Sequence, residues 1–222
     1  MADFDCFHME RIFPPIRGNS SYDVPQILAA ALTYDIAVPV HNPVAGALPK
    51  NWSISTNVHA QSGLPVTAIA SQTLNPATGN VTIAFPSVVP GQPYYLYGAQ
   101  CTASNGGQRC PGTQGVNPAA FNAPPAGQNG DLGRNVLRGT HSWQVDLALQ
   151  RTFSLIERLK LEARGEAFNV FNHPNFGLPN VTLGAANFGL PTTALSGALP
   201  GVSSLYQIGG PRSLQFALKL RF

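Results

Sequence analysis

Hydrophobic and polar residues alternate along five separated segments of the chain, and this period of two is the most informative feature of the sequence. The clearest case is SLQFALKLRF, residues 213–222. Its even positions are all apolar: Leu214, Phe216, Leu218, Leu220 and Phe222. Successive side chains of a β-strand point to opposite faces of a sheet, so this segment is predicted to be a strand with one apolar and one polar face.

Two segments before it repeat the pattern. In residues 143–153 the odd positions are apolar except for Arg151, a long cation near the strand end that can extend to an interface. In residues 158–168 the odd positions are apolar or small and charged residues stand between them. These charged residues are Lys160, Glu162, Arg164 and Glu166. A strand with four alternating charges is predicted to turn that face toward water.

Two earlier segments, residues 23–36 and 52–66, alternate less regularly and are also predicted to be strands. In the first of them Gln26 interrupts the apolar face. Pro25 has no amide hydrogen to donate to a neighbouring strand, so we place it at the start of this strand.

The connections between the predicted strands are of two kinds. A tight turn at residues 154–157 contrasts with the long stretches 71–142 and 172–212, which are rich in Gly, Pro, Asn and Ala. Short turns on one side and long loops on the other are typical of bacterial outer-membrane barrels, whereas compact soluble domains rarely contain loops of this size. We therefore predict an all-β fold, an antiparallel meander of about five long strands that forms the C-terminal part of a transmembrane β-barrel in the cell outer membrane of a Gram-negative bacterium. The predicted organisation is a loop end at 1–21, a barrel hairpin at 22–70, an extracellular loop at 71–142, a barrel hairpin at 143–171, an extracellular loop at 172–212 and the last strand at 213–222.

Alternation suits a membrane because lipid cannot hydrogen-bond a backbone, so each spanning strand must pair with its neighbours and turn apolar side chains to the lipid. Aromatic residues near the strand ends fit the interface girdles of such barrels. They are Tyr34, Trp52, Trp143, Phe153, Phe171 and Phe222. The charges of residues 158–168 and Asp146 on the neighbouring strand are predicted to face the lumen, either along a substrate path or as cross-strand ion pairs that hold the wall. Of these two roles, the cross-strand ion pairs are favoured.

The composition narrows the class of protein. Apolar residues make up 44% of the chain and charged residues only 10%, against about a quarter in soluble globular proteins. The net charge of +3 is spread without any basic run, so we expect no nucleic-acid partner.

The longest apolar run, residues 27–32, is far shorter than the roughly 20 residues that a spanning helix needs. The N-terminal segment MADFDCFHMERIF has no basic region followed by an apolar one and is not expected to be a signal peptide, which leaves a cytoplasmic protein or the tail of a longer exported one.

The chain has three cysteines. Cys101 and Cys110 enclose a Gly-rich segment that can turn back on itself, so a disulfide between them is favoured over two unrelated thiols. Cys6 stands alone. No Cys-x-x-Cys pair with nearby histidines is present, so no zinc site or other metal is expected.

Catalytic signatures such as G-x-S-x-G, H-E-x-x-H or a P-loop are missing from the sequence, so we expect no enzyme and no cofactor. His141 and His173 fall near predicted strand ends, where rim residues are favoured over a surface metal pair. The aromatic run Tyr94, Tyr95 and Tyr97 in the long loop is a candidate for stacking on a sugar or chelate ring, or for packing of the loop on itself.

The run NGDLGRNVLRGTHSWQVDLALQRTFSLIERLKLEARGEAFNVFNHPNFG, residues 129–177, closely resembles the penultimate hairpin of TonB-dependent receptors of the carboxypeptidase-regulatory-like, Oar-like type. SSYDVPQILAAALTYDIAVP and WSISTNVHAQSGLPVTA are similar to the preceding strands of that family, and GGPRSLQFALKLRF resembles its last strand. The stretch FNVFNHPNFG is the most specific part of this resemblance. In outer-membrane barrels a C-terminal aromatic preceded by alternating apolar residues resembles the signal that the barrel-assembly machinery reads.

This resemblance implies an energy-coupled transporter in which a plug domain fills a barrel of 22 strands. Its partners would be outer-membrane lipid, the barrel-assembly machinery and a TonB-type coupler that acts through an N-terminal part. The sequence is therefore expected to be the C-terminal fragment of a receptor that imports a large ligand, a siderophore or an oligosaccharide. The alternatives are a secreted or surface β-sandwich used for adhesion and the tail of a passive porin.

Overall fold

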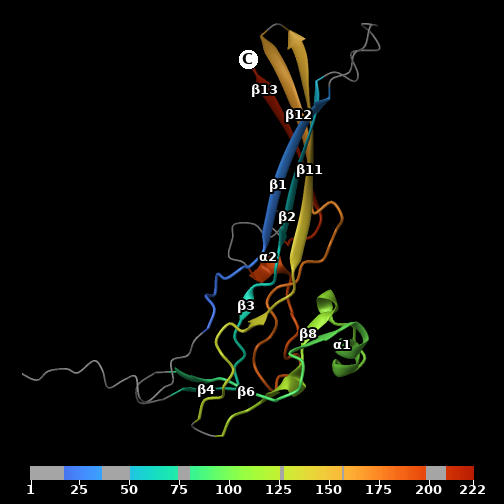
Figure 1. Ribbon diagram of the computed structural model, residues 1–222. Coiled ribbons are helices and arrows are strands. Elements are labelled where there is room, and N and C mark those ends of the chain that lie inside the picture. Colours follow the sequence, from blue (N-terminus) through green and yellow to red (C-terminus); the bar gives the residue numbers. More distant parts are fainter. Residues whose placement is uncertain (1–17, 37–50, 75–80, 126–127, 157, 199–208) are drawn as a thin grey trace, which may run out of the picture. The chain divides into compact units, whose positions relative to one another are not determined.

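The protein is described from a computed structural model, which covers residues 18–36, 51–74, 81–125, 128–156, 158–198 and 209–222 (Figure 1). Residues 1–17 of the predicted loop end, which include Cys6, and residues 37–50 of the predicted hairpin at 22–70 fall outside these ranges. The chain divides into two compact units. The first, here called the loop unit, comprises Met1–Val24, Gly63–Gly139 and Leu178–Thr192, and the second, the sheet unit, comprises Pro25–Ser62, Thr140–Gly177 and Thr193–Phe222.

The sheet unit is built on a five-stranded antiparallel sheet, which confirms the predicted meander. Its strands follow the order β1-β2-β11-β12-β13. They are β1 (Ile27–Ile36), β2 (Trp52–Gln61), β11 (Ser142–Ile156), β12 (Leu159–Phe168) and β13 (Ser213–Arg221). The four strand pairs are all antiparallel (Figure 1). A short helix, α2 (Leu195–Ala198), belongs to the same unit.

Two strand boundaries differ from the sequence prediction. The strand predicted at 52–66 ends at Gln61, and Pro65–Val66 forms a separate strand, β3. A Cβ atom on Gly63 would lie 1.9 Å from the backbone oxygen of Gly139, so the chain comes too close to itself at this point for a side chain. The turn predicted at 154–157 is also shorter, because β11 continues to Ile156 across a register shift between Ser154 and Ile156.

The predicted long loop at 71–142 is a folded body, and this part of the prediction was incomplete. The loop unit contains four two-stranded sheets, which pair β10 with β3, β4 with β5, β6 with β9 and β7 with β8. The strands are β3 (Pro65–Val66), β4 (Ser71–Leu74), β5 (Val81–Ala84), β6 (Ser87–Val88), β7 (Tyr95–Tyr97), β8 (Gln114–Val116), β9 (Phe121–Asn122) and β10 (Leu137–Arg138), with the helix α1 (Gly98–Ser104) and the 3-10 turns η2 (Pro111–Thr113) and η3 (Pro118–Ala120). Strands of two to four residues are too short to show a period in the sequence. Among the described ranges no helix is long and apolar enough to cross a membrane.

The loop unit has a small hydrophobic core of its own. Its buried members come from all over the unit: Val66, Ala68, Val116, Ala120, Phe121, Leu132, Leu137 and Phe188. The ring of Phe121 lies 5.4 Å from that of Tyr94 and 6.1 Å from that of Phe188, measured between centroids. Because Phe188 comes from the 178–192 segment, this core ties together pieces that are distant in sequence.

Candidate functional site

One face of the five-stranded sheet is apolar apart from Thr56 and Arg151. Pairing places Leu147 opposite Thr56 on β2 and opposite Ala167 on β12, and places Leu161 opposite Leu220 on β13. Most of the large apolar residues of the five strands therefore fall on one side. They are Leu28, Ala30, Leu32, Tyr34, Ile36, Trp52, Ile54, Val58, Ala60, Trp143, Val145, Leu147, Leu149, Phe153, Leu161, Ala163, Gly165, Ala167, Leu214, Phe216, Leu218 and Leu220.

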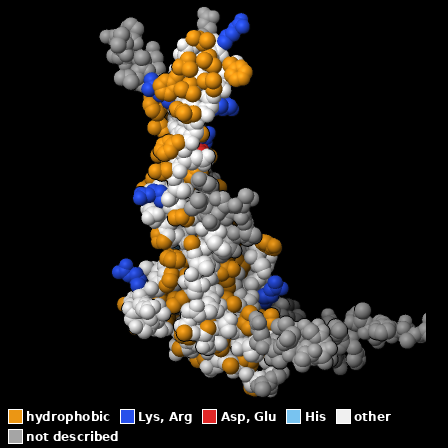
Figure 2. Space-filling view, turned by 180° about the vertical axis from the view of Figure 1, so that it is seen from behind, with side chains coloured by type: hydrophobic (Ala, Val, Ile, Leu, Met, Phe, Trp, Pro, Cys, Tyr) orange, Lys and Arg blue, Asp and Glu red, His pale blue; other side chains and the backbone are white. Residues whose placement is uncertain are grey.

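None of these side chains is buried in a core: those of the edge strands β1 and β13 are mostly exposed, and those of the inner strands are mostly half-buried. The exposed fraction is 66% for Leu32, 82% for Phe216 and 75% for Leu218. Figure 2 shows hydrophobic side chains gathered over the end of the sheet at the top of the view, with Lys and Arg side chains around them. Contiguous apolar patches of such extent are rare on soluble proteins and mark a surface that meets lipid or protein. Most of the predicted assembly signal lies on this face, and Phe222 follows the end of β13 with 99% of its surface exposed.

The opposite face of the sheet is polar and carries the charges predicted for 158–168. Glu162 forms an ion pair with Arg221 of β13 at 2.7 Å, and Arg164 forms one with Glu166 on its own strand at 2.6 Å. Lys160 lies opposite Arg221 in the register. The Glu162–Arg221 pair links β12 to β13, as expected for a cross-strand charge pair, whereas the Arg164–Glu166 pair lies within β12.

Asp146 lies on the same polar face, and hydrogen bonds hold its carboxylate in place. Its carboxylate accepts hydrogen bonds from the side-chain amide of Gln144 at 2.8 Å and from the backbone amide of Asn169 at 2.9 Å. Asn169 has a positive φ of 50° directly after β12, and its side chain donates to the backbone oxygen of His173 at 2.9 Å. Asp146 therefore fixes the chain as it leaves β12, a task that the alternation pattern does not reveal.

An open hollow of about 470 Å³ lies over the polar face near the short turn between β11 and β12. The residues around it come from β1, β2, β11 and β12, and from Asn51 directly before β2: Asp35, Ile36, Asn51, Trp52, Ser53, Gln150, Thr152, Ser154 and Lys160. Asn51 has a positive φ of 64° and donates to the backbone oxygen of Thr152 at 3.3 Å. Hydroxyl, amide, carboxylate and ammonium groups line the hollow, so it suits a hydrogen-bonding solute or polypeptide. Of these residues only Lys160 was predicted from the sequence to face the lumen, and the clustering depends on the register of the strands.

The other end of the sheet carries an aromatic group. The ring of Trp143 lies 4.3 Å from that of His173 and 5.9 Å from that of Phe171, between centroids. The Nδ1 atom of His173 lies 3.3 Å from the side-chain oxygen of Asn175. His173 is thus part of an aromatic and amide cluster, and His141 is exposed. In the part of the chain that the structure describes, no group of three or more His, Cys, Asp or Glu side chains could hold a metal ion.

The three candidate ligand-binding tyrosines have different surroundings in the loop unit. Tyr94 packs against Phe121 of the core. The hydroxyl of Tyr95 accepts a hydrogen bond from the backbone amide of Arg138 at 2.7 Å. Burial raises the pKa of Tyr95 above its ordinary value of 10.0, while this hydrogen bond acts in the opposite direction. Tyr97 is 58% exposed, so of the three it has the ring most accessible to a ligand.

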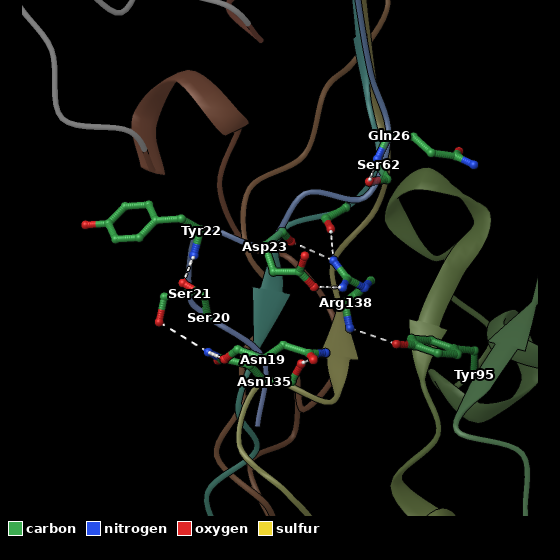
Figure 3. A network of polar contacts seen from close by, with 11 residues as sticks. Asn19, Ser20, Ser21, Tyr22, Asp23, Gln26, Ser62, Tyr95, Asn135 and Arg138 are labelled. Carbon is green, nitrogen blue, oxygen red and sulfur yellow. Dashed lines mark hydrogen bonds and ion pairs between the residues drawn. The ribbon is translucent and has the colours of Figure 1, made fainter. Parts of the chain in front are cut away.

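Arg138 is the centre of a polar network that holds the loop unit together (Figure 3). Its guanidinium forms an ion pair with the carboxylate of Asp23 and donates to the backbone oxygen of Asp23 at 2.8 Å. It also donates to the backbone oxygen of Gly63 at 3.4 Å. Together with the contact to Tyr95, these bonds connect four segments that are far apart in sequence.

Asn135 extends this network. Its φ is 57°, a left-handed conformation that Asn adopts more readily than most residues. Its backbone amide donates to the hydroxyl of Thr67 at 2.9 Å, and that hydroxyl donates to its side-chain oxygen at 2.8 Å. Its side-chain nitrogen donates to the backbone oxygen of Asn19 at 2.7 Å. Neither Asn135 nor Arg138 could be recognised from the sequence, because their partners lie between 43 and 116 residues away.

Cys101 and Cys110 form a disulfide with an S–S distance of 2.02 Å. Cys101 lies on α1 and Cys110 directly precedes η2, and both are buried. The bond closes the segment that contains Gly106 and Gly107, which have positive φ angles of 63° and 88°. Both glycines thus supply the reversal of direction that the chain needs at this position.

The comparisons with known proteins agree with this arrangement. A family model described as outer membrane beta barrel domain matches residues 11–215. No curated protein and no solved structure matches the chain. The family match covers most of the sequence and includes β1, β2, β11 and β12 in full and the first three residues of β13. The chain therefore belongs to the outer membrane beta barrel domain family, and the protein is located in the cell outer membrane.

Proposed function

We propose that this chain forms part of the wall of a TonB-dependent outer-membrane receptor, and that the whole receptor imports a large ligand, a siderophore or an oligosaccharide. The observation that carries the proposal is the folded loop unit. Ile27, Gln61 and Ser142 pair in one row across β1, β2 and β11, and the segments 18–24 and 63–139 of the loop unit connect to the strands at this row. The opposite end of β11 and β12 has only the short connection between Ile156 and Leu159.

This asymmetry supports a receptor because outer-membrane barrels keep short turns in the periplasm and long loops outside the cell. The loop unit would then be the extracellular part. Its core and its disulfide hold it in one shape before a ligand arrives, and such preorganisation lowers the entropic cost of capture. The exposed ring of Tyr97 is the most suitable group for stacking on a sugar or chelate ring.

The two faces of the sheet support the same proposal. Lipid would cover the apolar face, and the charged face would line a water-filled lumen. The two edge strands of the sheet are β1 and β13. Unpaired backbone groups on such edges are costly in lipid, so further strands are needed to complete the wall. The hollow near the short turn has the polar lining that contact with a plug or passage of a solute requires.

A passive porin shares the two-faced sheet, and a test must separate it from a receptor. The whole protein, purified from outer membranes and placed in planar lipid bilayers, is expected to be closed at rest, because a plug fills the lumen. Cells are expected to take up a labelled ferric siderophore or a labelled maltooligosaccharide only while the inner-membrane coupler is present. Steady open conductance together with uptake that persists without the coupler would contradict the proposal and favour a porin.

The proposal also defines the partners. The alternating residues of β13 and the terminal Phe222 are assigned to recognition by the barrel-assembly machinery, and no catalytic role is assigned to the chain. Deletion of Phe222 is expected to reduce the amount of folded protein in the outer membrane, measured from the heat-modifiable band on SDS gels. Substitution of Ser213 by alanine, at the other end of the same strand, is the matched control. Equal amounts of folded protein in both variants would rule out this assignment.

A further inference from the structure

The disulfide of the loop unit is enclosed by the rest of that unit. Only 3% of the surface of Cys101 and 2% of that of Cys110 are exposed. A Cβ atom on Gly115 of β8 would lie 2.7 Å from the Sγ atom of Cys101 and 2.9 Å from the Cδ2 atom of Leu190, so the chain packs tightly at this point. The hollow that borders Cys101 measures about 60 Å³, which is room for a few water molecules. A second folded protein therefore cannot reach the two sulfur atoms in this structure.

Local structure alone brings the two cysteines together. They are nine positions apart, and the segment between them turns back at its two glycines. The backbone amides of Asn105 and Gly107 donate to the backbone oxygens of Cys101 and Thr102, at 3.0 Å and 2.9 Å. Each of these bonds joins residues no more than five positions apart. The pair can therefore meet before any distant part of the chain has arrived.

The cover over the disulfide comes partly from a distant segment. Leu190 lies 89 positions after Cys101 in the sequence. The backbone amide of Val116 donates to the backbone oxygen of Gly189 at 3.1 Å, which fixes this segment beside β8. Contacts between residues far apart in sequence require the closure of a long loop and form later than local ones. The cysteines are thus accessible early in folding and enclosed once the segment around Leu190 is in place.

We propose that this chain is a substrate of a periplasmic dithiol oxidase, which forms the Cys101–Cys110 disulfide before the segment around Leu190 packs over it. An outer-membrane protein crosses the periplasm, a compartment that is kept oxidising by such enzymes. One cysteine thiolate attacks the disulfide of the oxidase, so that a mixed disulfide forms and one enzyme thiolate leaves. The other cysteine thiolate then attacks the mixed disulfide and releases the second enzyme thiolate. Two electrons pass to the oxidase, which ends as a dithiol, and the two thiol protons pass to the solvent.

The same order of events determines which cysteines pair. Cys6 is 95 positions from Cys101, whereas Cys110 is only nine positions away. Because the cost of closing a loop grows with the logarithm of its length, Cys101 should meet Cys110 about thirtyfold more often than it meets Cys6 in the open chain. The first disulfide to form is therefore the one that the structure contains. The proposal depends on the location of the protein in the outer membrane and not on ligand import, so either can fail without the other.

The test follows the unaltered whole protein in cells after a short pulse of synthesis. At each time the folded and unfolded forms are separated by heat-modifiable mobility on non-reducing gels. Free thiols are then blocked after unfolding, disulfides are reduced and tagged, and mass spectrometry gives the oxidised fraction of Cys101 and Cys110. We expect the disulfide already in the unfolded form, and no folded protein with both thiols free. Folded protein that carries free thiols and acquires the disulfide later would overturn the proposal, and so would early disulfides between Cys101 and Cys6.

A second comparison tests the enzyme. In cells that lack the periplasmic dithiol oxidase, the amount of folded unaltered protein should fall to that of the double variant C101S/C110S. The double variant is the matched control, because it needs no oxidation and should be equally abundant with and without the oxidase. Unaltered protein that stays abundant and fully oxidised without the enzyme would overturn the proposal. A parallel fall of the double variant would do the same, since the loss would then arise through another protein.

Discussion

A single arginine placed on either face of β11 should distinguish the lipid side of the sheet from the lumen side. Leu147 lies on the apolar face, four positions from Trp143 and six from Phe153, and is therefore near the middle of the apolar band. Substitution by arginine at such a depth costs roughly 2–4 kcal/mol of folding free energy in outer-membrane barrels. A cost of about 3 kcal/mol corresponds to a change of about a hundredfold in the folding equilibrium.

The matched control is the neighbouring residue, Ala148, which lies on the polar face opposite Glu166. An arginine there meets water and an opposite charge, and a cross-strand pair of this kind contributes roughly 0.2–1 kcal/mol in favour of folding. The free energy of unfolding is measured for the whole protein in phospholipid vesicles by urea titration, with the folded fraction read from heat-modifiable mobility on SDS gels. L147R should therefore be less stable than A148R by about 3 kcal/mol. Equal stabilities, or a greater loss in A148R, would refute the assignment of the faces.

Three further predictions concern the loop unit. D23N removes the ion pair with Arg138, which is partly exposed, so it should cost only about 0.5–1 kcal/mol and should modestly increase cleavage of the loop unit by a protease; unchanged cleavage would argue against this network. Replacing Cys101 and Cys110 by serine should cost roughly 2–3 kcal/mol because the unfolded chain loses a constraint, and reduction by dithiothreitol should accelerate proteolysis of the unaltered protein in the same way. Tyr95 is expected to ionise above pH 10.0, so its contribution to stability is complete below that pH and is lost as the pH rises through its raised pKa. Tyrosine ionisation, followed by absorbance at 295 nm, should include one tyrosine that ionises at higher pH than the others and that is missing from Y95F. Identical titration curves for the two proteins would show that the pKa of Tyr95 is not raised.

The sheet could be predicted from the sequence because its pattern repeats over long segments. Ten or more residues of alternation reveal a strand, and the polarity of the two sets of positions distinguishes its faces. The charges at Lys160, Glu162, Arg164 and Glu166 lie together on the polar face as the alternation indicates. The strand ends were predicted less accurately. The end of β2 depends on the close approach of Gly63 to Gly139, and these two residues are 76 positions apart.

The loop unit could not be predicted in the same way. Its strands contain only two to four residues, and its core gathers Val66, Phe121 and Phe188 from three distant parts of the chain. Pairings of such short strands are decided by tertiary packing and not by local pattern. The network around Arg138 has the same origin, because Asp23 lies 115 residues before it. Cys101 and Cys110 are the exception, since their short Gly-rich separation already favours a disulfide.

If the apolar face of the sheet lies against lipid, a scan along β13 should show it. Nitroxide labels are placed one at a time at residues 213–221 of the whole protein in outer membranes, with Cys6 replaced by serine and the disulfide kept. Collision with dissolved oxygen should peak at Leu214, Phe216, Leu218 and Leu220, and collision with a water-soluble nickel complex should peak at the positions between them. Profiles without alternation, or even-numbered positions that are accessible to the nickel complex, would show that this face does not lie against lipid.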